Sequence, residues 1–381
     1  MQPVSPCLAI DYGAASTQAV LCRPDGWWMP VPLDGERLEL SSAIHYGADG
    51  AIAVGQAAWR RAADDPGGFV LSPSRRGAAG APQMNKTRQD GEPSAHAPAT
   101  QPPHPARAPD LAGGPVQDVR LVVPAGWGPR RHQWLRQAAR QAGLGVPRLT
   151  AAPVAAGQRL LAAEAVHVQI PVGAFLLIGD LGAGAEMSVL RRGPHGLEIL
   201  STIAEPDAGG AAADEQLLRA VHPPQPGAGM QWIQLAAIRA AREALSQQAT
   251  VTVAMPPDPP IVLSHATADQ ATAAVWNAAG QLAARAVEAA ELTVADLAAV
   301  YLIGGVAGSP SAVHAVQARL GATGQPVQPV QQPTFAAVLG AADAGSVGVP
   351  AAQPATPPPA GIFAPLLAAA PTTAAWAPPA A

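Results

Sequence analysis

Ile10-Asp11-Tyr12-Gly13 near the start of the chain is matched by Gly179-Asp180-Leu181-Gly182-Ala183-Gly184 in its middle. Each motif follows one apolar run and precedes another, so each predicts a β-hairpin with a carboxylate and glycine at its tip. Glycine lets backbone N–H groups approach phosphate oxygens closely, and aspartates are typical ligands of hydrated Mg²⁺. Two such hairpins facing each other therefore predict a polyphosphate site. Its residues would be Asp11, Gly13, Asp180, Gly182 and Gly184, with Asp11 and Asp180 as metal ligands.

Composition separates ordered from unordered stretches of the 381-residue chain. The chain holds 38 Gly and 42 Pro, with only 4% aromatic and 13% charged residues. Stretches rich in Pro and Ala bury too little apolar surface to offset chain entropy. Residues 81–117 and 347–381 lack hydrophobic periodicity, and we predict a disordered insertion and a disordered tail there. The other residues suffice for two lobes with cores of their own, at 5–160 and 170–346.

Charge and cysteine content exclude several classes of protein. A formal net charge of −4 without a long basic run gives no reason to expect a nucleic-acid partner. Cys7 and Cys22 are too few for a disulfide scaffold or a four-cysteine zinc site, and we expect reduced thiols facing each other across the first hairpin. The sequence shows no secretory signal and no apolar stretch of about 20 residues. We therefore expect a cytoplasmic protein without membrane insertion.

Helices and strands alternate between these segments. The helix predicted over 129–142 is opened by Pro129 and closed by Gly143. Its apolar face would include Trp134, Leu135, Ala138 and Ala142. Its cationic side chains, with no acidic residue among them, are Arg130, Arg131, His132, Arg136 and Arg140. This basic helix is either a solvated face or a docking surface for an acidic protein partner.

Short sequence blocks then follow one another in the order typical of one family. The blocks are Ala9-Ile10-Asp11-Tyr12-Gly13, Val54-Gly55-Gln56-Ala57-Ala58, Val122-Val123-Pro124-Ala125 with Arg140-Gln141-Ala142-Gly143-Leu144, Ile178 to Leu190, Gly209-Gly210 with Asp214, Arg239 to Ser246, Leu302-Ile303-Gly304-Gly305, and Val338-Leu339-Gly340-Ala341-Ala342. Through them the chain resembles the nucleotide-binding domain of DnaK-type (heat-shock-protein-70) chaperones, within the actin-like ATPase superfamily.

The resemblance implies a fold and two cofactors. The fold would be the α/β, actin-like (ribonuclease H-like) ATPase fold, with two lobes around a nucleotide cleft, and the cofactors would be ATP and Mg²⁺. The residues that would face the nucleoside are Gly304, Gly305, Arg242 and Ser246. Residues 347–381 do not resemble the family's peptide-binding domain, so we expect any chaperone role to work through partners.

The catalytic residues of the family are incompletely kept. Its phosphate-contacting lysine falls at Ser74, beside Arg75, and Lys86 is the only lysine of the chain. Further departures fall at Ala14 and Ala15, Ala152, Ala185, Met187 and Gly308, where the family has two threonines, a glutamate, a threonine, an aspartate and an adenine-facing arginine. Arg75 would replace the lysine's charge but not its geometry. Glu186 would replace the aspartate after a one-residue register slip, which would also turn Met187 to the opposite face.

Three functions are consistent with this pattern. The first is an ATP-binding, chaperone-type ATPase domain with weak or lost hydrolysis, whose catalytic candidates are Asp11, Asp180, Arg75 and Glu186. The second is a pseudo-ATPase that binds no nucleotide and serves as an interaction scaffold. The third is another branch of the superfamily, a filament-forming actin-like protein or a small-molecule kinase.

Overall fold

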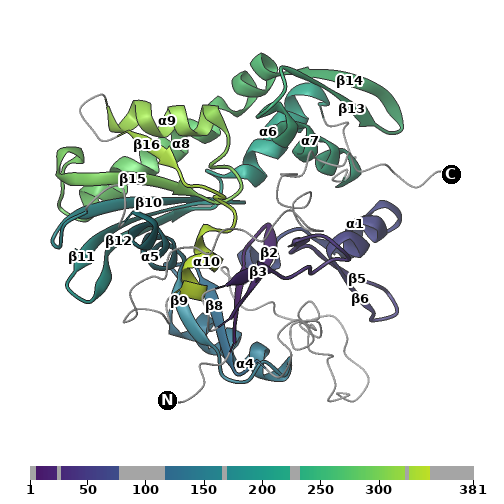
Figure 1. Cartoon of the computed structure of the whole chain (residues 1–381). Coiled ribbons are helices and arrows are strands. Elements are labelled where there is room, and N and C mark those ends of the chain that lie inside the picture. Colours follow the sequence, from purple (N-terminus) through teal and green to yellow (C-terminus); the bar gives the residue numbers. More distant parts are fainter. Residues whose placement is uncertain are drawn as a thin grey trace. The chain divides into compact units, whose positions relative to one another are not determined.

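The computed structural model describes residues 6–23, 27–76, 116–164, 170–223, 232–321 and 326–343. They fall into two compact units (Figure 1). Unit 1 runs to Leu160 and also includes Phe335–Ala344, whereas unit 2 is Leu161–Thr334. The last helix that the structure describes, expected within the second lobe at 170–346, thus groups with unit 1. The predicted disordered tail at 347–381 and nearly all of the predicted insertion at 81–117 lie outside the described residues.

Unit 1 is built on a sheet with the strand order β3-β2-β1-β8-β9. The strands are β1 (Cys7–Tyr12), β2 (Ser16–Cys22), β3 (Trp28–Pro30), β8 (Asp118–Val123) and β9 (Arg148–Ala151), and β4 (Glu39–Ser41) also pairs with β2. β1, β2 and β3 are antiparallel neighbours, whereas β8 and β9 run parallel to β1. Helix α4 (Pro129–Gln141) contributes Leu135 and Ala139 to the core of this sheet.

The rest of unit 1 is a small three-stranded sheet with helices. The sheet has the order β6-β5-β7, from β5 (Ile44–Tyr46), β6 (Ile52–Val54) and β7 (Phe69–Val70). The helices are α1 (Gly55–Asp64), the 3₁₀ turn η1 (Pro66–Gly68), α2 (Pro73–Arg76), α5 (Ala152–Glu164), which continues past Leu160, and α10 (Ala336–Asp343). The turn between β5 and β6 contains Asp49-Gly50, with Gly50 at φ 79°, a conformation that favours glycine.

Unit 2 is built on a second sheet, with the strand order β12-β11-β10-β15-β16. Its strands are β10 (Phe175–Leu181), β11 (Ala185–Gly193), β12 (Gly196–Glu205), β15 (Leu297–Ile303) and β16 (Val327–Pro329). The other elements are α6 (Gly210–Val221), α7 (Trp232–Leu245), β13 (Thr250–Met255), β14 (Asp258–Ser264), α8 (His265–Ala289), the 3₁₀ turn η2 (Val294–Asp296) and α9 (Pro310–Leu320). α8 carries much of the hydrophobic core, including Trp276 and Leu282.

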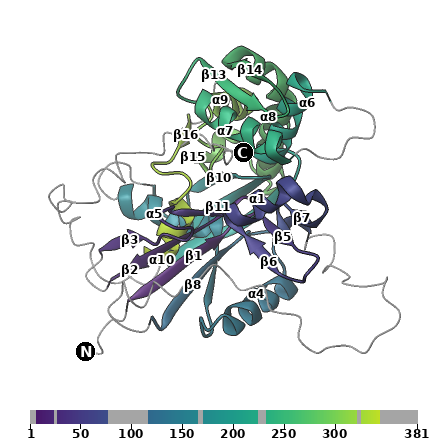
Figure 2. The same cartoon turned by 90° about the vertical axis from the view of Figure 1, so that its right-hand side faces the viewer.

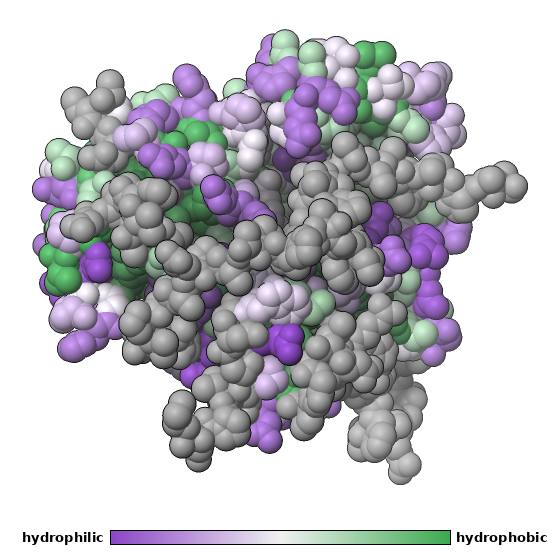
Figure 3. All heavy atoms as spheres, viewed as in Figure 1, coloured by the Kyte–Doolittle hydropathy of each residue, from purple (hydrophilic) through white to green (hydrophobic). Residues whose placement is uncertain are grey.

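The hairpin of β13 and β14 has one covered and one exposed face. Buried Val253 and Leu263 lie between neighbours that are mostly exposed, such as Val262, which is 72% accessible. In Figure 3, hydrophobic and hydrophilic residues are interspersed over the part of unit 2 formed by α6, β13 and β14. This alternation is what a two-stranded sheet packed on one side requires. No helix of the described ranges is long and apolar enough to cross a membrane.

The two main sheets share one topology. In each, an antiparallel meander of three strands is followed by two strands parallel to the first (Figures 1 and 2). In each, a helix, α4 or α9, connects those last two strands, and a further helix, α5 or α10, comes after them. Asp11 and Asp180 lie at equivalent positions, near the carboxyl end of the first strand of each sheet. The repeated hairpin motif therefore reflects a repeated structural unit.

Two expectations on unit 1 have different outcomes. Cys7 and Cys22 are cross-strand partners on β1 and β2, as predicted, and no disulfide joins them in the structure. The prediction that Trp134 belongs to the apolar face of α4 is wrong. Trp134 is 53% exposed and does not contribute to the buried face of the helix. The buried stripe of the helix passes through Leu135 and Ala139, and Trp134 instead contacts the ring of Trp127 edge to face, with 6.5 Å between the ring centres.

Helix α10 is held within unit 1 by polar and steric contacts. The buried Arg120 guanidinium on β8 donates to the carbonyl oxygens of Ala341 (2.9 Å) and Ala342 (2.6 Å), which lie in the last turn of the helix. Asp118 pairs with the same guanidinium at 2.6 Å. Gly340 packs so closely on α5 that a Cβ there would overlap the carbonyl group of Ala155. The absence of a side chain at Gly340 therefore permits the crossing of the two helices.

Replacing Gly340 by Ala is expected to lower the free energy of unfolding by about 1–3 kcal/mol, because the methyl group must displace backbone atoms of α5. Gly308→Ala is the matched control, since a Cβ at that position meets no atom within 4 Å. Urea denaturation followed by circular dichroism measures both variants. Equal stability of the two would contradict the close crossing.

Candidate functional site

The second glycine hairpin brings two carboxylates to one face of the sheet. In the register of β10 and β11, Asp180 is paired with Glu186, and Gly179 with Met187. Because directly paired residues project from the same face, Glu186 lies beside Asp180 without any register slip. The expectation that Glu186 reaches this position only through a one-residue register slip is therefore wrong. Met187 is fully buried on the other face, under Gly179, where a Cβ would collide with its sulfur atom.

Two other glycine-bearing turns of unit 2 pack on the glycine turn of this hairpin, so three such turns meet here. The N–H of Gly210 donates to the carbonyl of Gly182 (2.8 Å), and the N–H of Val306 donates to that of Leu181 (2.9 Å). A Cβ on Gly209 would overlap Gly184. A Cβ on Gly304, which has φ 87°, would overlap the carbonyl of Leu181. The predicted residues Gly182, Gly184 and Gly304 are thus brought together with Asp180, and the exposed Gly305 follows Gly304 directly.

A buried ion pair fixes helix α7 beside the glycine turns. The Nε of Arg242 on α7 donates to Oδ1 of Asp214 on α6 at 2.5 Å, and both side chains are about nine-tenths buried. Burial raises the pKa of the Asp214 carboxyl, and the charge of Arg242 opposes that rise. α6 begins at Gly210, so the pair ties α7 to the turn that contacts the hairpin. Arg242, predicted to face a nucleoside, also has this structural role.

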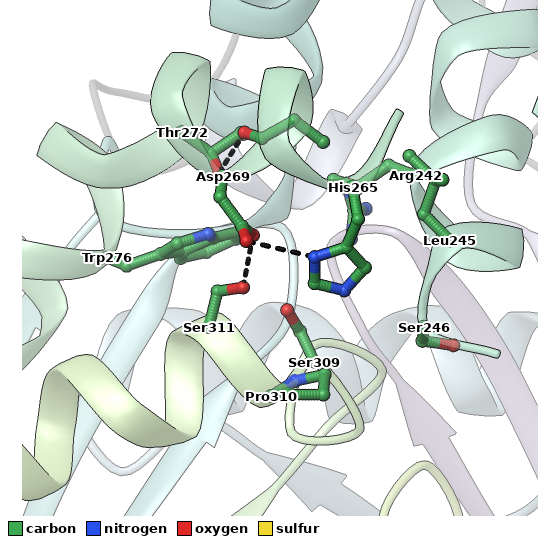
Figure 4. Close-up of a pocket in the computed structure, with 11 residues that line it drawn as sticks. Arg242, Leu245, Ser246, His265, Asp269, Thr272, Trp276, Ser309, Pro310 and Ser311 are labelled. Atoms are coloured by element: carbon green, nitrogen blue, oxygen red, sulfur yellow. Dashed lines mark hydrogen bonds and ion pairs between the residues drawn. The ribbon is translucent and has the colours of Figure 1, made fainter. Parts of the chain in front are cut away.

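A pocket in unit 2 opens next to this ion pair (Figure 4). The residues that line it are Arg242, Leu245, Ser246, His265, Ala268, Asp269, Thr272, Trp276, Ser309, Pro310 and Ser311. Arg242 and Ser246 were predicted for the nucleoside. His265, Asp269 and Ser311 were not, and the sequence signal for them is weak: an i, i+4 pair at the start of a helix and a Ser-Pro-Ser segment. The ring Nδ1 of His265 lies 2.9 Å from Oδ2 of Asp269, and the hydroxyl of Ser311 donates to Oδ1.

Hydrogen bonds to the backbone also hold the turn of the first hairpin, in unit 1. The N–H of Gly13 donates to the carbonyl of Ser16 (3.1 Å), and the hydroxyl of Ser42 donates to the carbonyl of Gly13 (2.7 Å). Asp11 lies in β1, and burial raises the pKa of its carboxyl to about 7. Arg75 lies in the short helix α2, and its side chain is outside the described residues.

The donors present suit a hydrated divalent cation better than a fully protein-ligated one. Within the described ranges there is no group of three or more His, Cys, Asp or Glu side chains that could hold a metal ion. Asp180 and Glu186 form a pair of carboxylates at one hairpin, and Asp11 lies at the other. Mg²⁺ keeps several waters and uses one or two carboxylates plus phosphate oxygens, so the carboxylate pair of the second hairpin fits Mg²⁺ together with a polyphosphate.

Asp11→Asn is expected to stabilise the fold in a pH-dependent way. The carboxyl has a pKa of about 7 in the folded chain against an ordinary value of 3.8. Its contribution to stability is complete below pH 3.8 and is lost as the pH rises through about 7. The advantage of the uncharged Asn should therefore grow between these pH values and level off at no more than about 4 kcal/mol. Urea denaturation from about pH 4 to about pH 8.5 measures it, with the exposed Asp64→Asn as control, and a pH-independent effect would contradict the raised pKa.

Comparison with known proteins finds similar sequences among chaperones. No protein-family model matches it. It is 26% identical over 339 residues to the Chaperone protein HscA homolog of Methylobacillus flagellatus, covering 81% of this chain and 53% of that protein. It is 29% identical over 331 residues to that of Pseudomonas aeruginosa (78% and 51%) and 29% identical over 279 residues to that of Azotobacter vinelandii (66% and 44%). The chain spans about half the length of these relatives. With its hairpins and glycine turns, the chain is similar to a nucleotide-binding domain of the heat-shock-protein-70 type.

Proposed function

We propose that this chain binds ATP with Mg²⁺ as a chaperone-type ATPase domain of the actin-like, two-lobed kind, with weak or lost hydrolysis. The observation that carries the proposal is the meeting of three glycine turns beside Asp180. Backbone N–H groups that lack neighbouring side chains are suited to phosphate oxygens, because nothing prevents close approach. A pocket lined by Arg242 and Ser246 opens in the same unit, where a nucleoside would be held.

Each predicted residue has a role in this proposal. Gly13, Gly182 and Gly184 would face the phosphates, and Gly304 and Gly305 would face the nucleoside. Gly182 and Gly305 have the open space, whereas Gly13, Gly184 and Gly304 pack on backbone atoms of the chain and would shape the turns. Asp11 and Asp180 would hold the hydrated Mg²⁺, which supplies charge neutralisation on the phosphate oxygens when bound. Because a metal ligand must be ionised, the raised pKa of Asp11 makes its contribution greatest above about pH 7.

Weak or lost hydrolysis follows from the side chains at the second hairpin. Phosphoryl transfer depends on charged groups that position the nucleophile and stabilise the developing charge. Met187 is fully buried among apolar residues, so it offers no such group. Ala152, at the position of the family's glutamate, offers none either. Glu186 beside Asp180 is the carboxylate that would compensate, and Arg75 would supply the missing cation.

Calorimetric titration with ATP tests the proposal directly. We expect Mg²⁺-dependent binding with a dissociation constant of about micromolar order, and loss of the Mg²⁺-dependent part in the Asp11→Ala, Asp180→Ala double variant. Asp64→Ala, which removes an exposed carboxylate of α1, is the matched control. No heat up to millimolar ATP would favour the scaffold that binds no nucleotide. Unchanged affinity of the double variant would show that the metal-ligand assignment is wrong.

We also propose that helix α4 docks an acidic protein partner. Arg130, Arg131, Arg136 and Arg140 form no ion pair with the acidic side chains that the structure describes. The guanidinium of Arg131 lies 5.7 Å from the ring centre of Trp127, and the neighbouring Trp134 is exposed. Arginine and tryptophan are the side chains that most often dominate protein interfaces. An acidic segment with apolar residues would match both the charge and the indole.

A synthetic peptide of alternating Glu and Leu residues is a suitable probe for α4. We expect binding at low salt that is weakened about tenfold by Arg130→Ala, Arg131→Ala and Arg140→Ala together. Arg60→Ala with Arg61→Ala on α1 is the control, since it removes exposed arginines elsewhere in unit 1. Fluorescence anisotropy measures both. Equal losses in the two variants, or tighter binding of single-stranded DNA than of the peptide, would contradict a protein-docking role.

A further inference from the structure

The pocket of unit 2 contains an imidazole whose orientation is set by two helices. His265 is the first residue of α8, directly after Ser264, whose side chain caps the helix by accepting from the N–H of Thr267 (3.1 Å). Asp269, one turn later, accepts from the ring Nδ1 of His265 at 2.9 Å. Its second oxygen accepts from the hydroxyl of Ser311 at the start of α9. The carboxylate thus joins the histidine to both α8 and α9.

These contacts determine which ring nitrogen carries the proton. An ionised carboxylate only accepts hydrogen bonds, so Nδ1 must donate to Asp269. In the neutral ring the other nitrogen, Nε2, is then an acceptor. Figure 4 shows Nε2 turned away from Asp269, toward the side of the pocket where Ser309 and Ser246 lie. The ring of His265 makes no second hydrogen bond to any residue that the structure describes.

The other polar groups around the pocket already have partners, with one exception. Arg242 donates to Asp214, the hydroxyl of Ser246 donates to the carbonyl of Glu243 (2.7 Å), and that of Thr272 donates to the carbonyl of Ala268 (2.8 Å). The exception is Ser309, whose hydroxyl forms no capping bond to α9 and can rotate to donate or accept. Nε2 of His265 is therefore the acceptor in the pocket with a fixed direction.

The surroundings of this acceptor are mainly apolar. Leu245, Ala268 and the buried Trp276 supply apolar walls. The nearby Gly308 has no side chain, and a Cβ built on it meets no atom within 4 Å. Flat heteroaromatic rings with a few polar edge atoms suit a site of this kind, with apolar walls and a single directional acceptor.

We propose that His265 selects the base of the bound nucleotide by accepting a hydrogen bond at Nε2 from an exocyclic amino group. Adenine carries such an amino group, whereas a purine with a keto oxygen at the same position would set two acceptors against each other. A site built to bond a donor rejects an analogue that lacks it, because both polar groups are then left unpaired. Asp269 and Ser311 are positioning residues that hold the ring. The inference rests on the proposed binding of ATP.

ATP and ITP are the probes, because they differ only in the amino or keto group at the purine 6-position and in the proton that N1 of the keto form carries. We expect the wild-type chain to bind ATP about tenfold or more tightly than ITP, as measured by calorimetry with Mg²⁺. In His265→Ala this ratio should fall to about one through loss of ATP affinity. In Asp269→Asn the ratio should also fall, because an amide either donates or accepts and no longer dictates the tautomer. A merely structural role of Asp269 would weaken both nucleotides equally.

His314→Ala is the matched control, since His314 is an exposed histidine on α9 outside the pocket, and it should keep the wild-type ratio. Wild type that binds ATP and ITP equally, or a His265→Ala variant that keeps the preference, would overturn the inference and leave the proposed function standing. Wild type that binds neither nucleotide would overturn both.

A second measurement needs no variant that must fold. In the wild-type chain labelled with ¹⁵N at its histidines, the resonance of His265 Nε2 should shift on addition of ATP and much less on addition of ITP. Equal shifts with both nucleotides would contradict the hydrogen bond.

Discussion

Close backbone packing of three glycine turns is the constraint on which the candidate site depends. Gly209 lies against Gly184, and Gly304 lies against Leu181, at distances that leave no space for a Cβ. The hydrogen bonds from Gly210 to Gly182 and from Val306 to Leu181 require this approach. They join the end of β10 to the start of α6 and to the loop that leads into α9. A side chain at Gly209 or Gly304 would separate the segments, so the arrangement of unit 2 around Asp180 depends on the absence of a side chain at these two positions.

The ion pair of Arg242 and Asp214 extends this constraint from the turns to helix α7. Both groups are buried, so the attraction between them is set against the cost of removing two charges from water. Such pairs add little net stability over a well-packed apolar pair, but losing one partner leaves an uncompensated charge. The pair therefore specifies where α7 lies more than it strengthens the fold. Arg239, on the same helix, pairs with the exposed Glu243 at 3.1 Å and has no such effect.

Sequence reasoning succeeded where the signal is local. The hairpins, the pairing of Cys7 with Cys22 and most helices and strands follow from apolar runs and turn residues that lie close together in the chain. It failed for Trp134 because an amphipathic pattern does not fix the edge of a buried stripe: Trp134 shares its face with exposed Gln137, not with Leu135.

The two misjudged features of the site have the same kind of cause. Glu186 was thought to need a register slip, but cross-strand pairing places it opposite Asp180 directly. His265, Asp269 and Ser311 were missed because they come from two helices that are distant in the sequence. The hydrogen bond from Ser311 to Asp269 joins residues that are 42 positions apart. Only tertiary structure reports such a contact.

The chain has the glycine turns of the family that it resembles but lacks several of the family's catalytic side chains, and this difference has a physical explanation. A site made of backbone is part of the fold, because the glycines that shape it also let the surrounding segments pack. A catalytic side chain at the surface of a site contributes little to folding and can even oppose it, as the raised pKa of Asp11 indicates. Loss of catalytic residues is therefore compatible with full retention of the glycine turns. Retention of the turns is an argument for the family's fold and for space in which phosphates fit. Asp11 costs stability when it is ionised, so the proposed binding of a cation would give this carboxylate a role that folding does not.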